Sequence, residues 1–103
     1  MKKKVTIELI EDKLFDLTQA YGKIKENFDN LEREYILLKA QIYTRPEVAG
    51  LGSQHMRDAQ CEIYSQETET GKNFLELKTK MDIINMNIRL WTAIARVHTS
   101  WNQ

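Results

Sequence analysis

Residues 7–42 of the chain read IELIEDKLFDLTQAYGKIKENFDNLEREYILLKAQI. Apolar side chains recur in this stretch at alternating steps of three and four residues, and no charged residue takes one of their positions. These positions are Ile7, Ile10, Leu14, Leu17, Tyr21, Ile24, Phe28, Leu31, Tyr35, Leu38 and Ile42. An average spacing of about 3.5 residues, kept over several heptads, is typical of a helix that buries a narrow stripe against another helix. The stretch therefore predicts one long helix over residues 7–44, with coiled-coil-like packing and Thr6 as its N-cap.

Three positions of this stripe hold large aromatic side chains. Tyr21, Phe28 and Tyr35 fall at a positions of the heptad, where a parallel two-stranded coiled coil prefers β-branched residues. Large rings suit an antiparallel hairpin or a bundle, in which they meet smaller side chains. We expect these three residues and Leu38 to pack between helices.

The single proline of the chain, Pro46, is expected to end the first helix, because the residue before a proline avoids helical geometry. Two glycines follow, so residues 45–53 are predicted to form a loop at the elbow of a hairpin. Ser53 is a suitable N-cap for a second helix over residues 54–66. The apolar residues that continue the spacing in this helix are Met56, Ala59 and Ile63.

Residues 65–70 are polar and acidic, and a glycine follows them. The second helix either ends there or continues as a solvated length into the third. A break is favoured, because Asn73 and Glu76 have the spacing of a capping box ahead of an apolar run. The third helix is then predicted over residues 74–98.

The third helix carries two apolar stripes. The first consists of Phe74, Leu77, Met81, Ile84, Ile88, Trp91 and Ala95, and the second of Leu90, Ile94, Val97 and Trp101. Two stripes on one helix imply two neighbours, which we expect to be the first helix of the same chain and another subunit. The sequence thus predicts an all-α antiparallel hairpin of long helices that assembles into an oligomeric bundle. The packing residues of this helix are expected to include Ile88, Leu90, Trp91 and Ile94.

The length of 103 residues fits a single helical domain, and zero formal net charge favours no class of partner. Lysines at positions 2–4 make residues 1–5 a basic tail that we expect to be mobile. Cys61 is the single cysteine, so an intrachain disulfide is impossible. A lone cysteine favours a cytoplasmic location. No uncharged run approaches the length of a membrane span, so we expect no membrane contact.

Residues typical of an active site are scarce in this sequence. His55 and Cys61 would point to different faces of one helix, which makes them a poor metal pair. The sequence contains no glycine-rich phosphate loop, no nucleophilic serine motif and no calcium-binding loop. We expect neither catalysis nor a cofactor, a bound metal or a small-molecule substrate.

Cations and aromatic residues occur together at two places, a combination that binds the phosphates and the stacked bases of single-stranded DNA. The first place is the C-terminal segment, which has no acidic residue after Asp82. The second is the elbow, next to Tyr43. The candidate nucleic-acid-binding residues are Arg89, Arg96, His98 and Trp101 at the first place and Lys39 and Arg45 at the second.

The end of the first helix, Leu38-Lys39-Ala40-Gln41-Ile42 followed by Tyr43, resembles a basic segment of the UvsY-type recombination mediators of T4-like phages. The order of features over residues 30–95 is similar too: a long amphipathic helix, this segment, a loop, and helices with a buried tryptophan. The layout also resembles small helical proteins of phage and mobile-element recombination modules, where a segment like residues 52–60 opens the second half. In the UvsY-type segment a lysine and an arginine two residues later are implicated in binding single-stranded DNA. Lys39 matches the lysine, and Gln41 stands in place of the arginine.

The resemblance implies oligomerisation, the loading of a recombinase and a location in the cytoplasm of a bacterial or phage-infected cell. Two functions are therefore expected from the sequence. The first is a non-catalytic accessory protein that assists DNA recombination or replication through oligomerisation and contacts with single-stranded DNA or a recombinase. The alternative is a protein-interaction module, such as a scaffold or an inhibitor of a host protein, that binds no nucleic acid.

Overall fold

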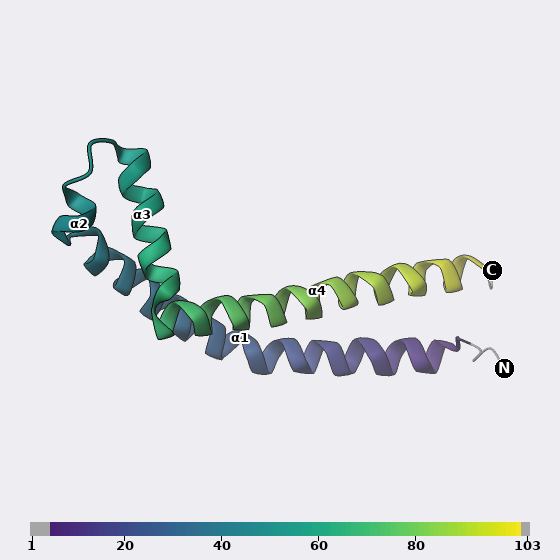
Figure 1. Ribbon diagram of the computed structural model, residues 1–103. Helices are drawn as coiled ribbons and strands as arrows, with labels where there is room; N and C mark the ends of the chain where they lie inside the picture. Colours follow the sequence, from purple (N-terminus) through teal and green to yellow (C-terminus); the bar gives the residue numbers. More distant parts are fainter. Residues whose placement is uncertain (1–4, 102–103) are drawn as a thin grey trace. The chain divides into compact units, whose positions relative to one another are not determined.

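The computed structural model describes residues 5–101, and it describes the side chains of residues 5–99. Within this range the regular structure consists of helices, without a strand (Figure 1). The helices are α1 (Ile7–Tyr43), α2 (Pro46–Ala49), α3 (Gln54–Glu67) and α4 (Glu69–Trp101). The prediction of an all-α protein is confirmed. The basic tail predicted at residues 1–5 lies outside the described residues, apart from Val5.

The internal contacts of the chain divide it into two compact units. We call Met1–Lys25 with Lys80–Gln103 the terminal unit, and Glu26–Thr79 the elbow unit. In each of them a length of α1 lies antiparallel to a length of α4, as in the predicted hairpin (Figure 1). The single domain predicted for residues 1–103 stays a prediction.

The apolar stripe of α1 packs inward as the heptad spacing predicts. Ten of its eleven residues are buried or half-buried, and the exception is Ile7 in the first turn, which is 55% exposed. In the elbow unit the Tyr35 ring stacks on Phe74 of α4 with 4.6 Å between centroids, and the Phe28 ring lies 5.4 Å from the same ring. Stacked aromatic rings at these distances contribute stability beyond their buried area.

Both predicted caps at the starts of α1 and α3 are present. The Thr6 hydroxyl accepts a hydrogen bond from the Leu9 amide at 3.2 Å, and the Ser53 hydroxyl accepts one from the Met56 amide at 3.1 Å. The loop predicted over residues 45–53 is partly wrong, because it contains the one-turn helix α2. Pro46 suits the first position of a helix, and Val48 of the same turn is fully buried.

The start of α4 differs from the prediction. The chain breaks at Thr68 alone, and α4 begins at Glu69, so the predicted start at residue 74 is wrong. Asn73 and Glu76 lie inside α4 and form no capping box. The cap is Thr68, whose hydroxyl accepts from the Gly71 amide at 3.0 Å and donates to the Ser65 carbonyl oxygen at 2.6 Å.

The first apolar stripe of α4, Phe74 to Ala95, is buried or half-buried throughout, as predicted. On α3 the three residues that continue the spacing, Met56, Ala59 and Ile63, face outward. The face of α3 that packs inward instead carries Cys61 and Ser65. These small side chains allow a close approach of α3 to α1, where Cys61 joins Ile42 and Val48 in one hydrophobic cluster, with Leu38, Tyr43 and Tyr64 packed against it.

No helix within residues 5–101 has an apolar stretch of the length that crossing a membrane requires.

Candidate functional site

The structure places the predicted nucleic-acid-binding residues in both units. Lys39 and Arg45 belong to the elbow unit, and Arg89, Arg96 and His98 belong to the terminal unit. Trp101 is the last residue of α4, and its side chain lies outside the described range. The two groups are therefore considered separately.

In the elbow unit Lys39 is held by other side chains of the protein. Its ammonium nitrogen lies 2.7 Å from Oε2 of Glu62 on α3 and 4.8 Å from the centre of the Tyr35 ring. The sequence suggested that Lys39 contacts phosphate, but this charge is already paired within the elbow unit.

Glu62 is the centre of a network of hydrogen bonds that sequence reasoning missed. Its Oε1 accepts from the Tyr35 hydroxyl at 3.1 Å and from the side-chain amide Nε2 of Gln66 at 3.1 Å, while its Oε2 faces Lys39. The hydrogen bond from Lys39, more than any other contact, holds the pKa of the Glu62 carboxyl below its usual value, although partial burial opposes this shift. Burial, followed by the hydrogen bond to Glu62, raises the pKa of Tyr35 to about 12.

A shallow pocket of about 320 Å³ adjoins this network. It is lined by Lys39, Ala40, Tyr43, Asp58, Cys61 and Glu62. The Cys61 thiol donates to the carbonyl oxygen of Lys39 at 3.4 Å, and the Glu62 carboxylate is engaged by three side chains. Lys39, Cys61 and Glu62 of this pocket thus bind one another and join α1 to α3.

Tyr43 and Arg57 join the end of α1 to the loop before α3. The Tyr43 hydroxyl accepts from the side-chain amide of Gln54 at 2.8 Å and from Nε of Arg57 at 3.4 Å. The Arg57 guanidinium also donates to the Leu51 carbonyl oxygen at 2.9 Å. Arg45, in contrast, is exposed at the start of α2. Of the two elbow residues predicted to bind DNA, Arg45 is exposed, and Lys39 is half-buried and paired with Glu62.

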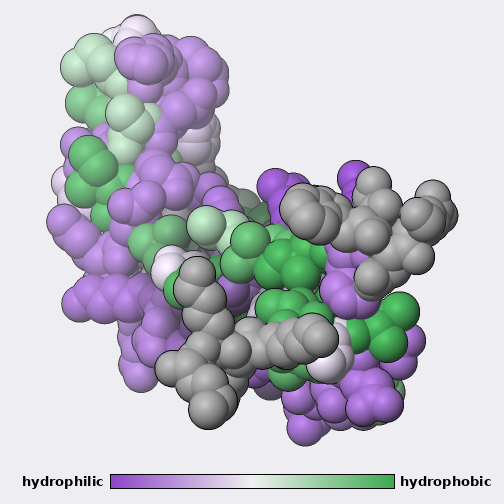
Figure 2. Space-filling model, turned by 90° about the vertical axis from the view of Figure 1, so that its right-hand side faces the viewer, coloured by the Kyte–Doolittle hydropathy of each residue, from purple (hydrophilic) through white to green (hydrophobic). Residues whose placement is uncertain are grey.

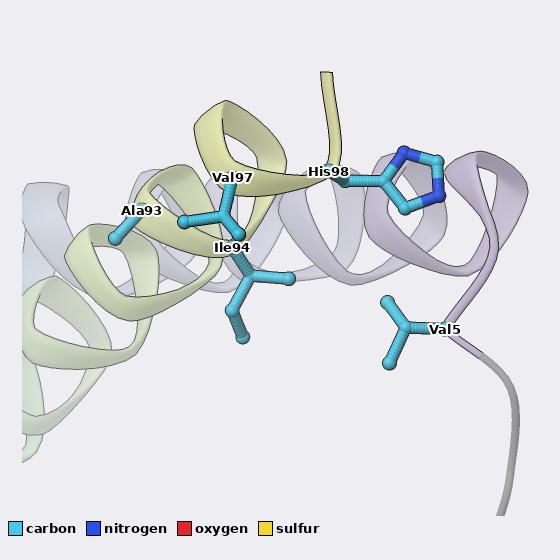
Figure 3. Close-up of a pocket in the computed structure, with 5 residues that line it drawn as sticks. All are labelled: Val5, Ala93, Ile94, Val97 and His98. Atoms are coloured by element: carbon cyan, nitrogen blue, oxygen red, sulfur yellow. The ribbon is translucent and has the colours of Figure 1, made fainter. Parts of the chain in front are cut away.

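In the terminal unit Arg89 and Arg96 are both exposed on α4. They are seven residues apart, so they lie two turns apart on the same side of the helix, about 10.5 Å along its axis. Trp91 is half-buried in the first stripe, where the sequence predicted packing. His98 is half-buried and lines a groove of about 430 Å³ with Val5, Ala93, Ile94 and Val97 (Figure 3).

The outer side of α4 in the terminal unit carries a continuous apolar stripe. We call it the outer stripe, and it consists of Ile83, Met86, Leu90, Ala93 and Val97. All five residues are exposed, and the four larger ones are each more than half exposed. The sequence predicted a second stripe with Leu90 and Val97, but Ile94 of that stripe is half-buried. The prediction missed the other three members of the outer stripe, which are Ile83, Met86 and Ala93. The space-filling view shows hydrophobic surface exposed among hydrophilic surface on the face that it draws (Figure 2).

The other predicted packing residues take the following places. Tyr35 is buried, and Tyr21, Phe28, Leu38, Ile88 and Trp91 are half-buried.

Within the described residues no three His, Cys, Asp or Glu side chains gather in a way that could hold a metal ion.

Comparison with known proteins finds no protein-family model and no solved structure that matches this chain.

Proposed function

We propose that this protein is a non-catalytic helical accessory protein that binds other macromolecules through the outer side of α4. Its setting would be DNA recombination or replication in the cytoplasm of a bacterial or phage-infected cell, with single-stranded DNA or a recombinase as partner. The observation that carries the proposal is the exposed side of α4, where two arginines border a continuous apolar stripe. The resemblance to UvsY-type mediators supports the setting, and Lys39, its matching residue, is paired with Glu62.

The physical argument starts from the solvent exposure of the outer stripe. Monomeric soluble proteins expose few contiguous apolar surfaces, and larger ones mark sites of interaction. Burial of an exposed Leu, Ile, Met or Val side chain is worth about 1.5–3 kcal/mol, so the stripe offers several kcal/mol to a partner that covers it. Arg89 and Arg96 add positive charge, and no acidic residue follows them in the sequence. Such a positive segment suits the phosphates of single-stranded DNA.

The DNA contact is tested by fluorescence anisotropy with a labelled poly-dT oligonucleotide over a series of salt concentrations. Arg89→Ala with Arg96→Ala is expected to weaken binding and to reduce the magnitude of the salt slope by about 1.4, because each lost phosphate contact on a single strand accounts for about 0.7. The matched control is Lys13→Ala with Lys23→Ala, which removes two exposed cations from α1 of the same unit. Equal losses in both double variants would show a nonspecific charge effect and contradict the proposed site.

A second candidate function is a protein-interaction module that binds no nucleic acid. It is favoured by three acidic residues, Glu8, Glu11 and Asp12, on the first turns of α1 in the same unit. Their negative charge offsets the positive charge of the C-terminal segment and would repel the phosphates of DNA. Absence of poly-dT binding at low salt would select this candidate over the first.

The poly-dT measurement also includes Lys39→Ala with Arg45→Ala. A specific loss of affinity in that variant would place the DNA site at the elbow unit.

A further inference from the structure

We propose that the outer stripe is a self-association surface, which pairs with the same stripe of a second copy in antiparallel orientation. The inference rests on the proposed function, in which association through α4 is one part, and it names the partner and the geometry.

The first observation is the position of the outer stripe on its helix. The inner stripe of α4 in the terminal unit consists of Met81, Ile84, Ile88, Trp91 and Ala95, and each member of the outer stripe follows one of these by two residues. Two residues turn an α-helix by about 200°, so the two stripes lie on nearly opposite sides. Helix α1 covers the inner stripe, and this leaves the outer stripe exposed.

The second observation is the spacing within the outer stripe. Its steps are three, four, three and four, which places Ile83, Leu90 and Val97 at a positions and Met86 and Ala93 at d positions of a heptad. This is the spacing at which one helix packs along another, and the stripe extends over about 21 Å. A helical partner with the same period therefore fits it, and α4 of a second copy has that period.

The third observation is the arrangement of charge beside the stripe, which selects the orientation. Asp82 stands at one end of the edge that flanks the stripe and Arg96 near the other, each exposed. When two copies lie antiparallel with Met86 opposite Leu90 of the second copy, each Asp82 comes beside Arg96 of the other chain. Arg89 lies midway along the same edge and faces Arg89 of the other chain, so two ion pairs flank one contact between like charges. Large residues also meet small ones, because Ile83 then lies opposite Ala93. A parallel pair would place Asp82 across from Asn87 and would form no ion pair.

The size of the surface sets the expected strength of the dimer. Four turns of one helix bury less than the roughly 800 Å² per partner of a standard interface. The dimer is therefore expected to be reversible and to depend on protein concentration. The two symmetric ion pairs would contribute mainly to orientation, because exposed pairs add little to affinity.

The experiment is sedimentation velocity on the full chain without DNA, over micromolar to millimolar concentrations. Leu90→Glu is expected to abolish dimers, and Phe15→Glu, which alters an exposed apolar residue on α1 of the same unit, is the matched control that keeps them. Asp82→Arg and Arg96→Asp should each weaken the dimer by about three- to tenfold, because each replaces two attractions by two repulsions, and the double charge reversal should restore it. Circular dichroism of each variant checks that its helices are intact.

Three results would overturn the inference. A wild-type protein that stays monomeric at every concentration has no self-association surface, and a dimer unaffected by Leu90→Glu uses another face. A dimer sensitive to Leu90→Glu whose charge reversals do not compensate each other is not antiparallel. Because this assay contains no DNA, each of these results leaves the poly-dT measurement, and with it the proposed function, to be judged separately.

Discussion

The Lys39 ammonium lies 2.7 Å from the Glu62 carboxylate, across the contact between α1 and α3. The two residues are 23 positions apart in the sequence, and each lies on a helix whose charged side chains could equally point into solvent. Their pairing lies beside the cluster of Cys61, Ile42 and Val48 and joins the same two helices. It also engages, in an ion pair within the elbow unit, the cation that the resemblance to UvsY-type segments assigns to DNA.

Glu62→Gln tests how much this pairing stabilises the elbow unit. The substitution removes the charge opposite Lys39 but keeps groups that can bond Tyr35 and Gln66. Since both charged side chains are more than a third exposed, solvent screening limits the expected loss to about 0.5–1 kcal/mol of unfolding free energy. Urea denaturation followed by circular dichroism measures this loss. The control is Glu67→Gln, an exposed acid at the end of α3, which is expected to change stability by less.

The same pair predicts a pH dependence. The pKa of Glu62 is lowered in the folded protein from an ordinary value of 4.5, so the unfolded chain takes up the proton first as the pH falls. The stability from this carboxylate is fully present above pH 4.5 and is lost as the pH falls through the lower pKa of the folded state. Wild type and Glu62→Gln should therefore differ most at neutral pH and converge in acid. A difference that stays constant with pH would show that the charge of Glu62 does not act in this way.

The heptad spacing was sufficient to predict α1 and most of α4, because a stripe of large apolar side chains is a local property of the sequence. It failed on α3, where the inward face is made of Cys61 and Ser65 rather than Met56 and Ile63. Small side chains carry no such signal, and their burial depends on how closely two helices approach. The Glu62 network was missed for the same reason, since an acid on a polar helix looks solvated until the neighbouring helix is placed. Gly71, a glycine beside a polar stretch, did indicate a break between the second and third helices. The predicted break was too wide, however, because it extended from residue 67 to residue 73 and the structure breaks at Thr68 alone.

Tyr35 is predicted to ionise only at strongly alkaline pH. Burial and the neighbouring Glu62 raise its pKa from 10.0 to about 12. A group whose pKa is raised on folding contributes stability that is complete below the unfolded value and is lost as the pH rises through the folded one. The tyrosinate difference spectra of wild type and Tyr35→Phe should therefore coincide near pH 10.0 and separate towards pH 12. Separation already near pH 10.0 would mean that the ring is not held as described. Glu62→Gln should move the separation to lower pH.

Gly71 and Gly22 are expected to respond in opposite directions to the same substitution. A Cβ on Gly71 would overlap the backbone carbonyl of Ser65, where the chain turns from α3 into α4, and backbone atoms cannot move aside cheaply. Gly71→Ala should therefore cost at least about 2 kcal/mol of unfolding free energy, or shift the turn at Thr68. A Cβ on Gly22 meets no atom within 4 Å, and this residue lies exposed inside α1. Gly22→Ala should stabilise the protein by about 0.5–1 kcal/mol, because alanine loses less backbone entropy in a helix. Thermal and urea denaturation of the two variants side by side measure both effects, and a neutral Gly71→Ala would contradict the close approach of Ser65 and Gly71.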